Sequence, residues 1–427
     1  MDIANIHQLF LKCNSVSTDT RKIEPNSLFV AIKGERFDAN TFAGEALQKG
    51  ASYVIIDNRD YYLDERTIVV SNSLETLQAL ATFHRQYLKL PIIALTGSNG
   101  KTTTKELINV VLSQQFNAKA TVGNLNNHIG VPLTLLTFDS LTEIGIVEMG
   151  ANHQKEIEFL CNIAQPDYGY ITNFGKAHLE GFGGVEGVIK GKSEMYTHLS
   201  HHHKTVFVNL EDPIQVEKTA TMTSISFGVN IEAADVNIAK IQANPFVEID
   251  FEKTHITSHL IGLYNANNIN AAIAIGKHFK VANSAIKKAI ESYIPENNRS
   301  QLVSKNSNEI ILDAYNANPS SIKVAIENFD QIDKSSKIAV LGDMFELGKE
   351  SLEEHRAIVE MLSNKANITT YFIGNDFYEN RSSQSNFHFF REFEDFAAML
   401  KAQPFRDKMI LIKGSRGMAL ERTLELL

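Results

Sequence analysis

The sequence has 427 residues, of which 43% are hydrophobic and 21% are charged, and its formal net charge is −9. This composition is that of a globular protein long enough for about three domains. The acidic balance argues against a nucleic-acid partner, because proteins that bind nucleic acid usually carry a basic excess. The two cysteines, Cys13 and Cys161, are too few and too far apart for a disulfide framework, and they indicate a reducing compartment.

The N-terminus lacks a basic segment followed by an apolar one, and no apolar run approaches the roughly 18–20 residues needed to span a bilayer. We therefore expect a cytoplasmic protein without a membrane span. The internal triplet His201–His203 precedes a strand-like run, so we interpret it as a loop, although histidine-rich tracts can also bind metal.

The predicted elements alternate between strand and helix along the chain. Short strands at 27–32 and 53–57, mixed with short helices, form a small α/β domain at residues 1–85. The second domain, residues 86–297, begins with a strand at 92–95, a glycine loop and a helix from 101 to about 115. Strands at 144–148, 168–172 and 206–209 continue the alternation, which favours a mostly parallel sheet.

Strands and helices are also predicted at the end of the second domain and throughout the third. Alternating apolar and polar residues at 246–261 predict a hairpin, and helices near 267–277 and 284–292 close the domain. The segment Pro295–Asn298 is typical of a linker. A third unit, residues 298–427, has predicted strands at 310–312, 338–341, 370–373 and 409–412, with helices between them and at the C-terminus. The fold class is therefore α/β with three domains, the last a doubly wound, Rossmann-like sheet.

The segment Thr96–Thr104, Thr-Gly-Ser-Asn-Gly-Lys-Thr-Thr-Thr, lies between a predicted strand and a predicted helix. In that context the backbone N–H groups of a glycine loop bind phosphate at the helix N-terminus. Lys101 would neutralise β- and γ-phosphate oxygens, and Thr102 would place its hydroxyl on Mg²⁺. The general phosphate loop has a glycine where this chain has Leu95, so the match is to a shorter form, and an accidental glycine-rich turn is the alternative. The expected nucleotide-binding residues are Thr96, Gly97, Ser98, Asn99, Gly100, Lys101, Thr102 and Thr103.

Four further side chains are candidates for this chemistry, and each has a structural alternative. Glu148 ends a predicted strand, where a carboxylate either faces the ligand crevice or is simply solvated. His178 lies past the end of the strand at 168–172, a place where a lone histidine is commonly structural or exposed. Lys192 reads from the residues alone as a surface lysine. Arg299, after the linker, could reach a phosphate with its fork of donors or form a salt bridge.

Taken in chain order, the motifs resemble the Mur ligase family, the amide-forming enzymes of bacterial cell-wall precursor synthesis. The resemblance covers essentially the whole chain. The matching segments are 18–21, 28–38, 96–104, 123–130, 148–151, 172–173, 178–180 and 262–268, followed by Arg299. Within the family, segments 313–319, 341–348 and 413–416 resemble the branch that joins D-alanyl-D-alanine to UDP-N-acetylmuramoyl tripeptide.

The resemblance implies roles for individual residues. The magnesium ligands would be Thr102, Glu148, His178 and Lys192, with Lys192 carbamylated into a carboxylate-like anion, and Arg299 would reach the γ-phosphate. Adenine and ribose would be held by Asn268, Asp313, Tyr315 and Asn316. The uridine nucleotide would be held by Thr20, Arg21, Lys33 and Gly34, the muramoyl side by Asn126 and Asn127, and the dipeptide by Ser415 and Arg416. One departure is Tyr264-Asn265, where the family commonly has His-Asn.

The function implied by the resemblance is an ATP- and Mg²⁺-dependent ligation through an acyl-phosphate. The first domain would bind the UDP substrate, the second ATP, and the third would swing onto the second; we expect a monomer. Two alternatives stay open at this point. One is another amide ligase of the superfamily, acting on folate polyglutamate or another muramoyl peptide, and the other is a non-catalytic nucleotide-binding protein.

Overall fold

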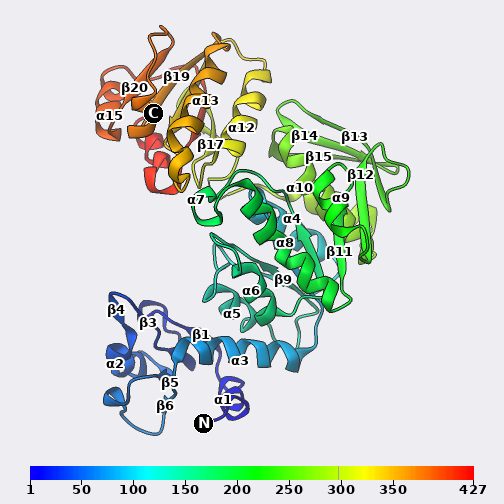
Figure 1. Cartoon of the computed structure of the whole chain (residues 1–427), viewed down its shortest axis with the longest axis vertical. Helices are drawn as coiled ribbons and strands as arrows, with labels where there is room; N and C mark the ends of the chain where they lie inside the picture. The colour runs from blue at the N-terminus through cyan, green and yellow to red at the C-terminus, as the bar shows by residue number, and fades with distance from the viewer. Residues whose placement is uncertain (297) are drawn as a thin grey trace.

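The computed structural model describes residues 1–296 and 298–427 and shows three α/β bodies following one another along the chain (Figure 1). Each body is built on its own sheet, of four, nine and six strands in the described residues. Parallel pairs predominate, so the predicted α/β class is confirmed. The expected linker at 295–298 includes Asn297, which lies outside the described residues, and the exact domain boundaries stay a prediction.

The N-terminal body is a small parallel sheet with one long helix leading out of it. Its strand order is β1 (Ser15–Ser17), β2 (Ser27–Val30), β5 (Ala51–Ile56) and β6 (Thr67–Val69). Helices α1 (Ile3–Phe10) and α2 (Ala43–Gln48) and the hairpin of β3 (Lys33–Gly34) and β4 (Phe37–Asp38) complete it. Helix α3 (Ser73–Leu88) begins at the cap Asn72, whose side chain accepts from the Glu75 N–H, and runs toward the central body (Figure 1).

The central body has a nine-stranded sheet in the order β15-β14-β13-β12-β11-β10-β7-β9-β8. The strands are β7 (Ile92–Thr96), β8 (Ala118–Ala120), β9 (Ile144–Glu148), β10 (Tyr168–Ile171), β11 (Thr205–Asn209), β12 (Ser224–Val229), β13 (Val236–Ala243), β14 (Phe246–Phe251) and β15 (Thr254–Ile261). The predicted hairpin is confirmed, because β14 and β15 pair antiparallel. Strands β12 and β13 extend the sheet where no strand was predicted.

Helices cover both sides of this sheet. They are α4 (Lys101–Leu112), α5 (Gly130–Leu135), α6 (Glu156–Ala164), α7 (Leu179–Phe182), α8 (Val185–His201), α9 (Pro213–Thr219), α10 (Ala266–His278) and α11 (Asn283–Ser292). Every residue of β7 is buried, as is usual for a parallel strand covered on both faces. The interpretation of the triplet as a loop is wrong at its first residue: His201 ends α8, and only His202 and His203 form the turn.

The C-terminal body has a six-stranded sheet in the order β16 (Gln301–Lys305), β17 (Asn308–Asp313), β21 (Met409–Lys413), β18 (Lys337–Gly342), β19 (Ile368–Ile373) and β20 (Phe387–Phe390). Only β16 is antiparallel to its neighbour. Its helices are α12 (Pro319–Gln331), α13 (Ser351–Ser363), α14 (Asn375–Glu379) and α15 (Phe393–Ala402). The helix predicted at the C-terminus is instead two 3-10 turns, separated by Ala419 in a left-handed conformation that ends the first. None of the helices in residues 1–296 and 298–427 combines the length and apolarity that a bilayer crossing requires.

Candidate active site

Three neighbouring strands of the central sheet end at one edge, and the sequence candidates lie there. The order β10-β7-β9 brings together the ends of β10, of β7, which leads into the phosphate loop, and of β9, which ends at Glu148. The carboxyl ends of adjacent parallel strands form the ligand crevice of an open α/β sheet. The predicted juxtaposition of the loop and Glu148 is confirmed.

The phosphate loop passes very close to helix α10. Gly100 has a left-handed backbone (φ 80°), and a Cβ atom there would lie 2.5 Å from Asn268 Oδ1. Thr104 Oγ1 donates to the same oxygen (3.0 Å), and Asn268 Nδ2 donates to Asn265 Oδ1 (2.8 Å). Only glycine permits this approach, which fixes Asn268 beside the loop.

The loop is also tied to the segment after β10. The backbone N–H groups of Ser98 and Asn99 donate to the carbonyl (3.0 Å) and side-chain oxygen (3.1 Å) of Asn173. Thr172 Oγ1 donates to the Asn99 carbonyl (2.5 Å). The Lys101 ammonium donates to the Gly97 carbonyl (2.8 Å), and burial lowers its pKa while Glu148 opposes that shift. The loop therefore holds its shape through its own protein contacts.

Glu148 and Thr102 form a compact oxygen site. Thr102 Oγ1 donates to Glu148 Oε2 (3.0 Å), and Asn126 Nδ2 donates to Glu148 Oε1 (2.8 Å). Glu148 is 1% exposed, so it is not the solvated strand-end acid of the alternative reading. A buried carboxylate beside a hydroxyl is the hard oxygen donor set that Mg²⁺ prefers, so these residues fit a magnesium ion.

Lys192 is a buried residue of α8, so the surface-lysine reading is wrong. Its side chain is 1% exposed, and its Nζ lies 5.2 Å from the centroid of the Phe182 ring. Burial, reinforced by the nearby Lys101 charge, holds its pKa well below the usual range. In the described part of the chain no carboxylate forms an ion pair with it. A neutral amine is the form that carbon dioxide can carbamylate, so the residue fits the implied modification.

His178 faces the C-terminal domain. It precedes α7 with a left-handed backbone (φ 54°), and its Nδ1 is hydrogen bonded to the carboxylate of Glu346. That hydrogen bond lowers the pKa of Glu346. Among the described residues, His178 forms no hydrogen bond or ion pair with Glu148 or Lys192, so the structure gathers the implied magnesium ligands only in part.

Two arginines lie against one tyrosine on the C-terminal side. The Arg299 guanidinium lies 3.7 Å from the centroid of the Tyr315 ring, and that of Arg416 lies 5.2 Å from it. Arg416 also donates to the Tyr315 hydroxyl (3.3 Å). The Arg299 Nε is buried without a hydrogen-bond partner among the described residues. Nearby, the Lys413 ammonium donates to Asp313 Oδ2 (2.6 Å) across adjacent strands. The two guanidinium groups make this cluster cationic, and the Lys413–Asp313 ion pair beside it is neutral overall. A cationic cluster of this kind is suited to bind an anion.

The C-terminal domain is docked on the phosphate loop. Asn318 caps α12 with its side-chain oxygen and donates from its Nδ2 to Asn99 Oδ1 (2.7 Å). Lys176 donates from its backbone N–H to Ser320 Oγ (2.8 Å) and pairs with Glu354 through its ammonium. The two domains thus meet directly over the loop.

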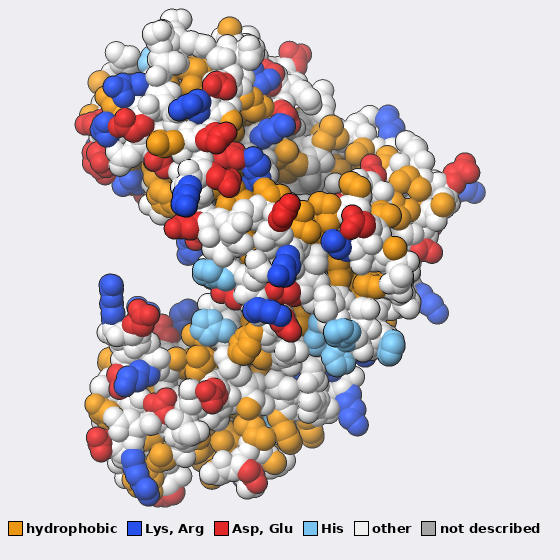
Figure 2. All heavy atoms as spheres, in the orientation of Figure 1, with side chains coloured by type: hydrophobic (Ala, Val, Ile, Leu, Met, Phe, Trp, Pro, Cys, Tyr) orange, Lys and Arg blue, Asp and Glu red, His pale blue; other side chains and the backbone are white. Residues whose placement is uncertain are grey.

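A cavity of about 1400 Å³ lies where the three domains meet, on the inner side of the notch seen in Figure 2. It is lined by these predicted residues: Ser98, Asn99, Gly100, Lys101, Thr102, Thr103, Asn126, Asn127, Glu148, His178, Asn268, Arg299, Asp313, Tyr315, Asn316, Ser415 and Arg416. The lining does not include Thr96, Gly97 or Lys192, nor the N-terminal residues Thr20, Arg21, Lys33 and Gly34.

Sequence reasoning missed Glu346, Asn318 and Lys413 as site residues. All three line the cavity, and all three lie in segments that mark the branch of the family. A charged or amide side chain at the C-terminal end of a strand of the third sheet, or within a few residues after it, was the signal that could have identified them.

Comparisons with known proteins agree with this site. The Mur ligase family, catalytic domain matches residues 12–85, the Mur ligase middle domain residues 95–276, and the Mur ligase, glutamate ligase domain residues 298–416. A UDP-N-acetylmuramoyl-tripeptide–D-alanyl-D-alanine ligase of Bacillus subtilis is 33% identical over 425 residues, which cover 96% of this chain and 92% of that protein. The chain belongs to the Mur ligase family.

Solved structures resemble this Mur ligase over its full length. A crystal structure of MurF from Acinetobacter baumannii superposes with a TM-score of 0.86 at 29% identity, covering 99% of this chain and 97% of the other. MurF ligase from Thermotoga maritima in complex with ADP gives a TM-score of 0.84 at 28% identity, covering 98% and 97%. In this Mur ligase Tyr264, the departure from the family pattern, bonds through its hydroxyl to Ser300 Oγ (2.8 Å) and lines the cavity.

Proposed function

We propose that this chain joins D-alanyl-D-alanine to UDP-N-acetylmuramoyl tripeptide, with hydrolysis of ATP to ADP and phosphate, through an acyl-phosphate. The observation that carries the proposal is that one cavity brings the phosphate loop, the Thr102–Glu148 pair and the Arg299–Tyr315–Arg416 cluster together from two domains. The branch is supported by relatives named for this reaction, which match the chain from end to end.

The first task of the site is to let two anions react. The terminal carboxylate of the tripeptide attacks the γ-phosphorus of ATP, and ADP leaves. Lys101 and Arg299 line the cavity from the central and C-terminal domains and would offset the repulsion between the two anions. The backbone N–H groups at the start of α4 add the positive end of a helix dipole.

Magnesium ions, when bound, neutralise phosphate charge and act as Lewis acids. Thr102 and Glu148 are the residues that would hold one ion. Lys192, as its carbamate, and His178 are those that would hold a second. Burial holds the pKa of the unmodified Lys192 amine well below its usual range, which favours the neutral form that carbon dioxide can modify.

The second task is to direct the amine. The free amine of D-alanyl-D-alanine attacks the acyl carbon, phosphate leaves, and the amide forms. Arg416 and Ser415 are proposed to bind the dipeptide, and Asn126 and Asn127 the muramoyl side; all four line the cavity, and Asn126 is hydrogen bonded to Glu148. The acyl-phosphate would hydrolyse in open water, so closure of the domains over this cavity would protect it.

The residues proposed to hold the two nucleotides lie on different domains. Asn268, Asp313, Tyr315 and Asn316 are proposed to hold adenine and ribose. Thr20, Arg21, Lys33 and Gly34 are proposed to hold the uridine nucleotide on the N-terminal domain. The two free thiols, of which Cys161 is buried, support a cytoplasmic location.

The test is phosphate release from ATP and Mg²⁺ with UDP-N-acetylmuramoyl tripeptide, with and without D-alanyl-D-alanine. We expect release that depends on the dipeptide. Release with another amine and carboxylate, but not with this pair, would keep the ligase mechanism and overturn the substrate assignment. ATP binding without phosphate release for any substrate pair would leave only a nucleotide-binding protein.

A further inference from the structure

The loop that follows β18 is held residue by residue by buried partners. The Asp343 N–H donates to the Ile373 carbonyl (3.0 Å), the Met344 N–H to His355 Nε2 (2.9 Å), and the Phe345 N–H to Ser415 Oγ (2.9 Å). Three successive backbone groups are therefore fixed by three different elements. The next residue along the chain is Glu346.

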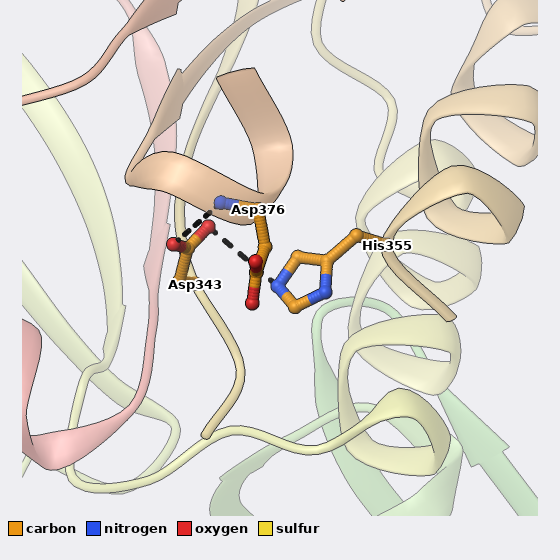
Figure 3. Close-up of side chains that lie close together, drawn as sticks. All are labelled: Asp343, His355 and Asp376. Atoms are coloured by element: carbon orange, nitrogen blue, oxygen red, sulfur yellow. Dashed lines mark hydrogen bonds and ion pairs between the residues drawn. The ribbon is translucent and has the colours of Figure 1, made fainter. Parts of the chain in front are cut away.

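The carboxylate of Asp343 and the imidazole of His355, both buried, support the start of this loop (Figure 3). The two oxygens of Asp343 accept the backbone N–H groups of Phe377 and Asp376, each at 3.0 Å. His355 donates from Nδ1 to the Ser351 carbonyl (2.7 Å), which leaves Nε2 as the acceptor for Met344. Asp343, His355 and Asp376 lie close enough to bind a metal, but the oxygens of Asp343 and the ring nitrogens of His355 already have partners. We therefore interpret the cluster as a structural support.

Glu346 projects from this braced loop to the central domain. Its side chain is 51% exposed, lines the cavity, and contacts His178 Nδ1 through Oε2. Its carbonyl accepts the Glu180 N–H (3.2 Å), so the backbone docks as well as the side chain. Both Glu346 (φ 62°) and His178 (φ 54°) have left-handed backbones. Strain of this kind persists where surrounding contacts impose it, and it is typical of functional positions.

We propose that Glu346 is a positioning residue that fixes the His178 imidazole across the domain boundary and leaves Nε2 as the nitrogen available to a metal ion. The inference rests on the proposed function, in which His178 is a metal ligand. A ligating histidine commonly donates its second ring N–H to a carboxylate, which fixes its tautomer and orientation. Here that carboxylate comes from another domain. The His178 imidazole is therefore held in this orientation only while the C-terminal domain is docked.

A different role is available to the same carboxylate. Glu346 lies near Ser415 and Arg416, so it could bind the ammonium group of the dipeptide. The observed contact favours the positioning role, because Glu346 Oε2 is already on His178 and its carbonyl is on the same segment. The experiment separates the two roles.

The test compares the full-length wild-type chain with Glu346→Gln and Glu354→Gln in a Mn²⁺ titration followed by electron paramagnetic resonance in the presence of ADP. Glu354→Gln is the matched control, because it removes a carboxylate from the same domain interface without touching His178. We expect Glu346→Gln to weaken one class of Mn²⁺ site about 10-fold or more, and Glu354→Gln to leave Mn²⁺ binding unchanged. In turnover, Glu346→Gln should lower kcat with little change in KM for the dipeptide.

Three outcomes would overturn the inference. Unchanged Mn²⁺ affinity in Glu346→Gln would remove the positioning role. A raised KM for D-alanyl-D-alanine with unchanged Mn²⁺ affinity would assign Glu346 to the amine. Equal losses of Mn²⁺ affinity in Glu346→Gln and Glu354→Gln would show that both variants act only by weakening the docking of the C-terminal domain. The Mn²⁺ titration needs no turnover. A wild-type chain that is inactive with the dipeptide would therefore overturn the proposed reaction, and the Mn²⁺ affinities could still be interpreted.

Discussion

Lys192 and Lys190 stand two positions apart on α8 and differ completely in environment. Lys190 is exposed, whereas Lys192 is 1% exposed, with no described carboxylate paired to it. We expect Lys192→Ala to lower kcat at least about 100-fold, because the variant cannot form the carbamate that would supply a ligand oxygen. Lys190→Ala is the control and should retain activity. Steady-state kinetics with circular dichroism on both variants separates lost chemistry from lost folding.

The proposed carbamate of Lys192 can be tested directly. Burial holds the pKa of Lys192 well below its usual range, which favours the neutral amine, the form that carbon dioxide can modify. Wild-type protein in ¹³C-bicarbonate should show a protein-bound carbamate resonance that is missing from Lys192→Ala and present in Lys190→Ala. An identical spectrum for all three proteins would contradict the modification.

Gly100 gives a prediction about geometry. An alanine there would need a left-handed backbone, at a cost of about 1–2 kcal/mol, and its Cβ would meet Asn268 Oδ1 at 2.5 Å. Gly183 is the matched control, because it is also left-handed (φ 76°) but nothing lies within 4 Å of its Cβ position. We expect both alanine variants to lose stability and only Gly100→Ala to lose ADP affinity, about 10-fold or more. Calorimetry measures both quantities, and equal ADP affinities would contradict the role of the contact.

Among the site residues, those that belong to a local sequence motif could be predicted from the sequence. Lys101, Thr102 and Glu148 were identified because a loop and a strand end carry their own pattern. The contact between Glu346 and His178 could not be predicted, because the two residues are 168 positions apart along the chain. The burial of Lys192 depends on which face of α8 packs inward, and a single lysine in a charged segment gives no sign of that.

Helices α1 and α3 are joined by a buried pair of histidines. His7 Nε2 and His84 Nδ1 are 3.0 Å apart, and His84 Nε2 donates to the Phe138 carbonyl (2.8 Å). Burial, with repulsion from His84, lowers the pKa of His7 from 6.5 to about 4. The unfolded chain therefore binds a proton below pH 6.5 that the folded chain does not accept until about pH 4.

The difference between the folded and unfolded pKa of His7 sets the direction in which stability changes with pH. The His7 contribution leaves the free energy of unfolding unchanged above pH 6.5 and lowers it between pH 6.5 and about 4, by up to about 1.4 kcal/mol per pH unit. Urea titrations at pH 7 and pH 5 should show a smaller pH dependence in His7→Phe than in the wild type, although the variant is less stable at pH 7. His201→Phe, at an exposed position, controls for the loss of one imidazole. A His7→Phe chain with the wild-type pH dependence would contradict the assignment.

Elements with a strong apolar run were predictable, and those without one were not. Strands such as β7 and β9 are buried along their whole length and match their predicted positions closely. β12 has a mixed pattern of exposed and buried residues and begins with alternating serines, so its sequence resembles a loop. It forms because the edge of β11 is available to pair with it. The C-terminal 3-10 turns likewise depend on tertiary contacts beneath Leu420, which is fully buried.

The whole molecule presents a cavity walled by three domains, with the third already docked on the second. We expect ADP with UDP-N-acetylmuramoyl tripeptide to shift the solution ensemble toward compact states, because the ligands contact more than one wall. Small-angle scattering should show a fall in the radius of gyration for the wild type with both ligands. Scattering curves that do not change with ligands would contradict closure.

The order of strands in the third sheet has a consequence for biosynthesis. Strand β21 lies between β17 and β18, although it is the last of the three to be made. A nascent chain that stops short of Met409 has two half-sheets with no strand to join them. The first two domains can fold as they leave the ribosome, but the third, with its part of the cavity, cannot form until Lys413 has emerged. A translation pause near this point would expose the unpaired edges of β17 and β18, which are the surfaces that a chaperone would have to protect.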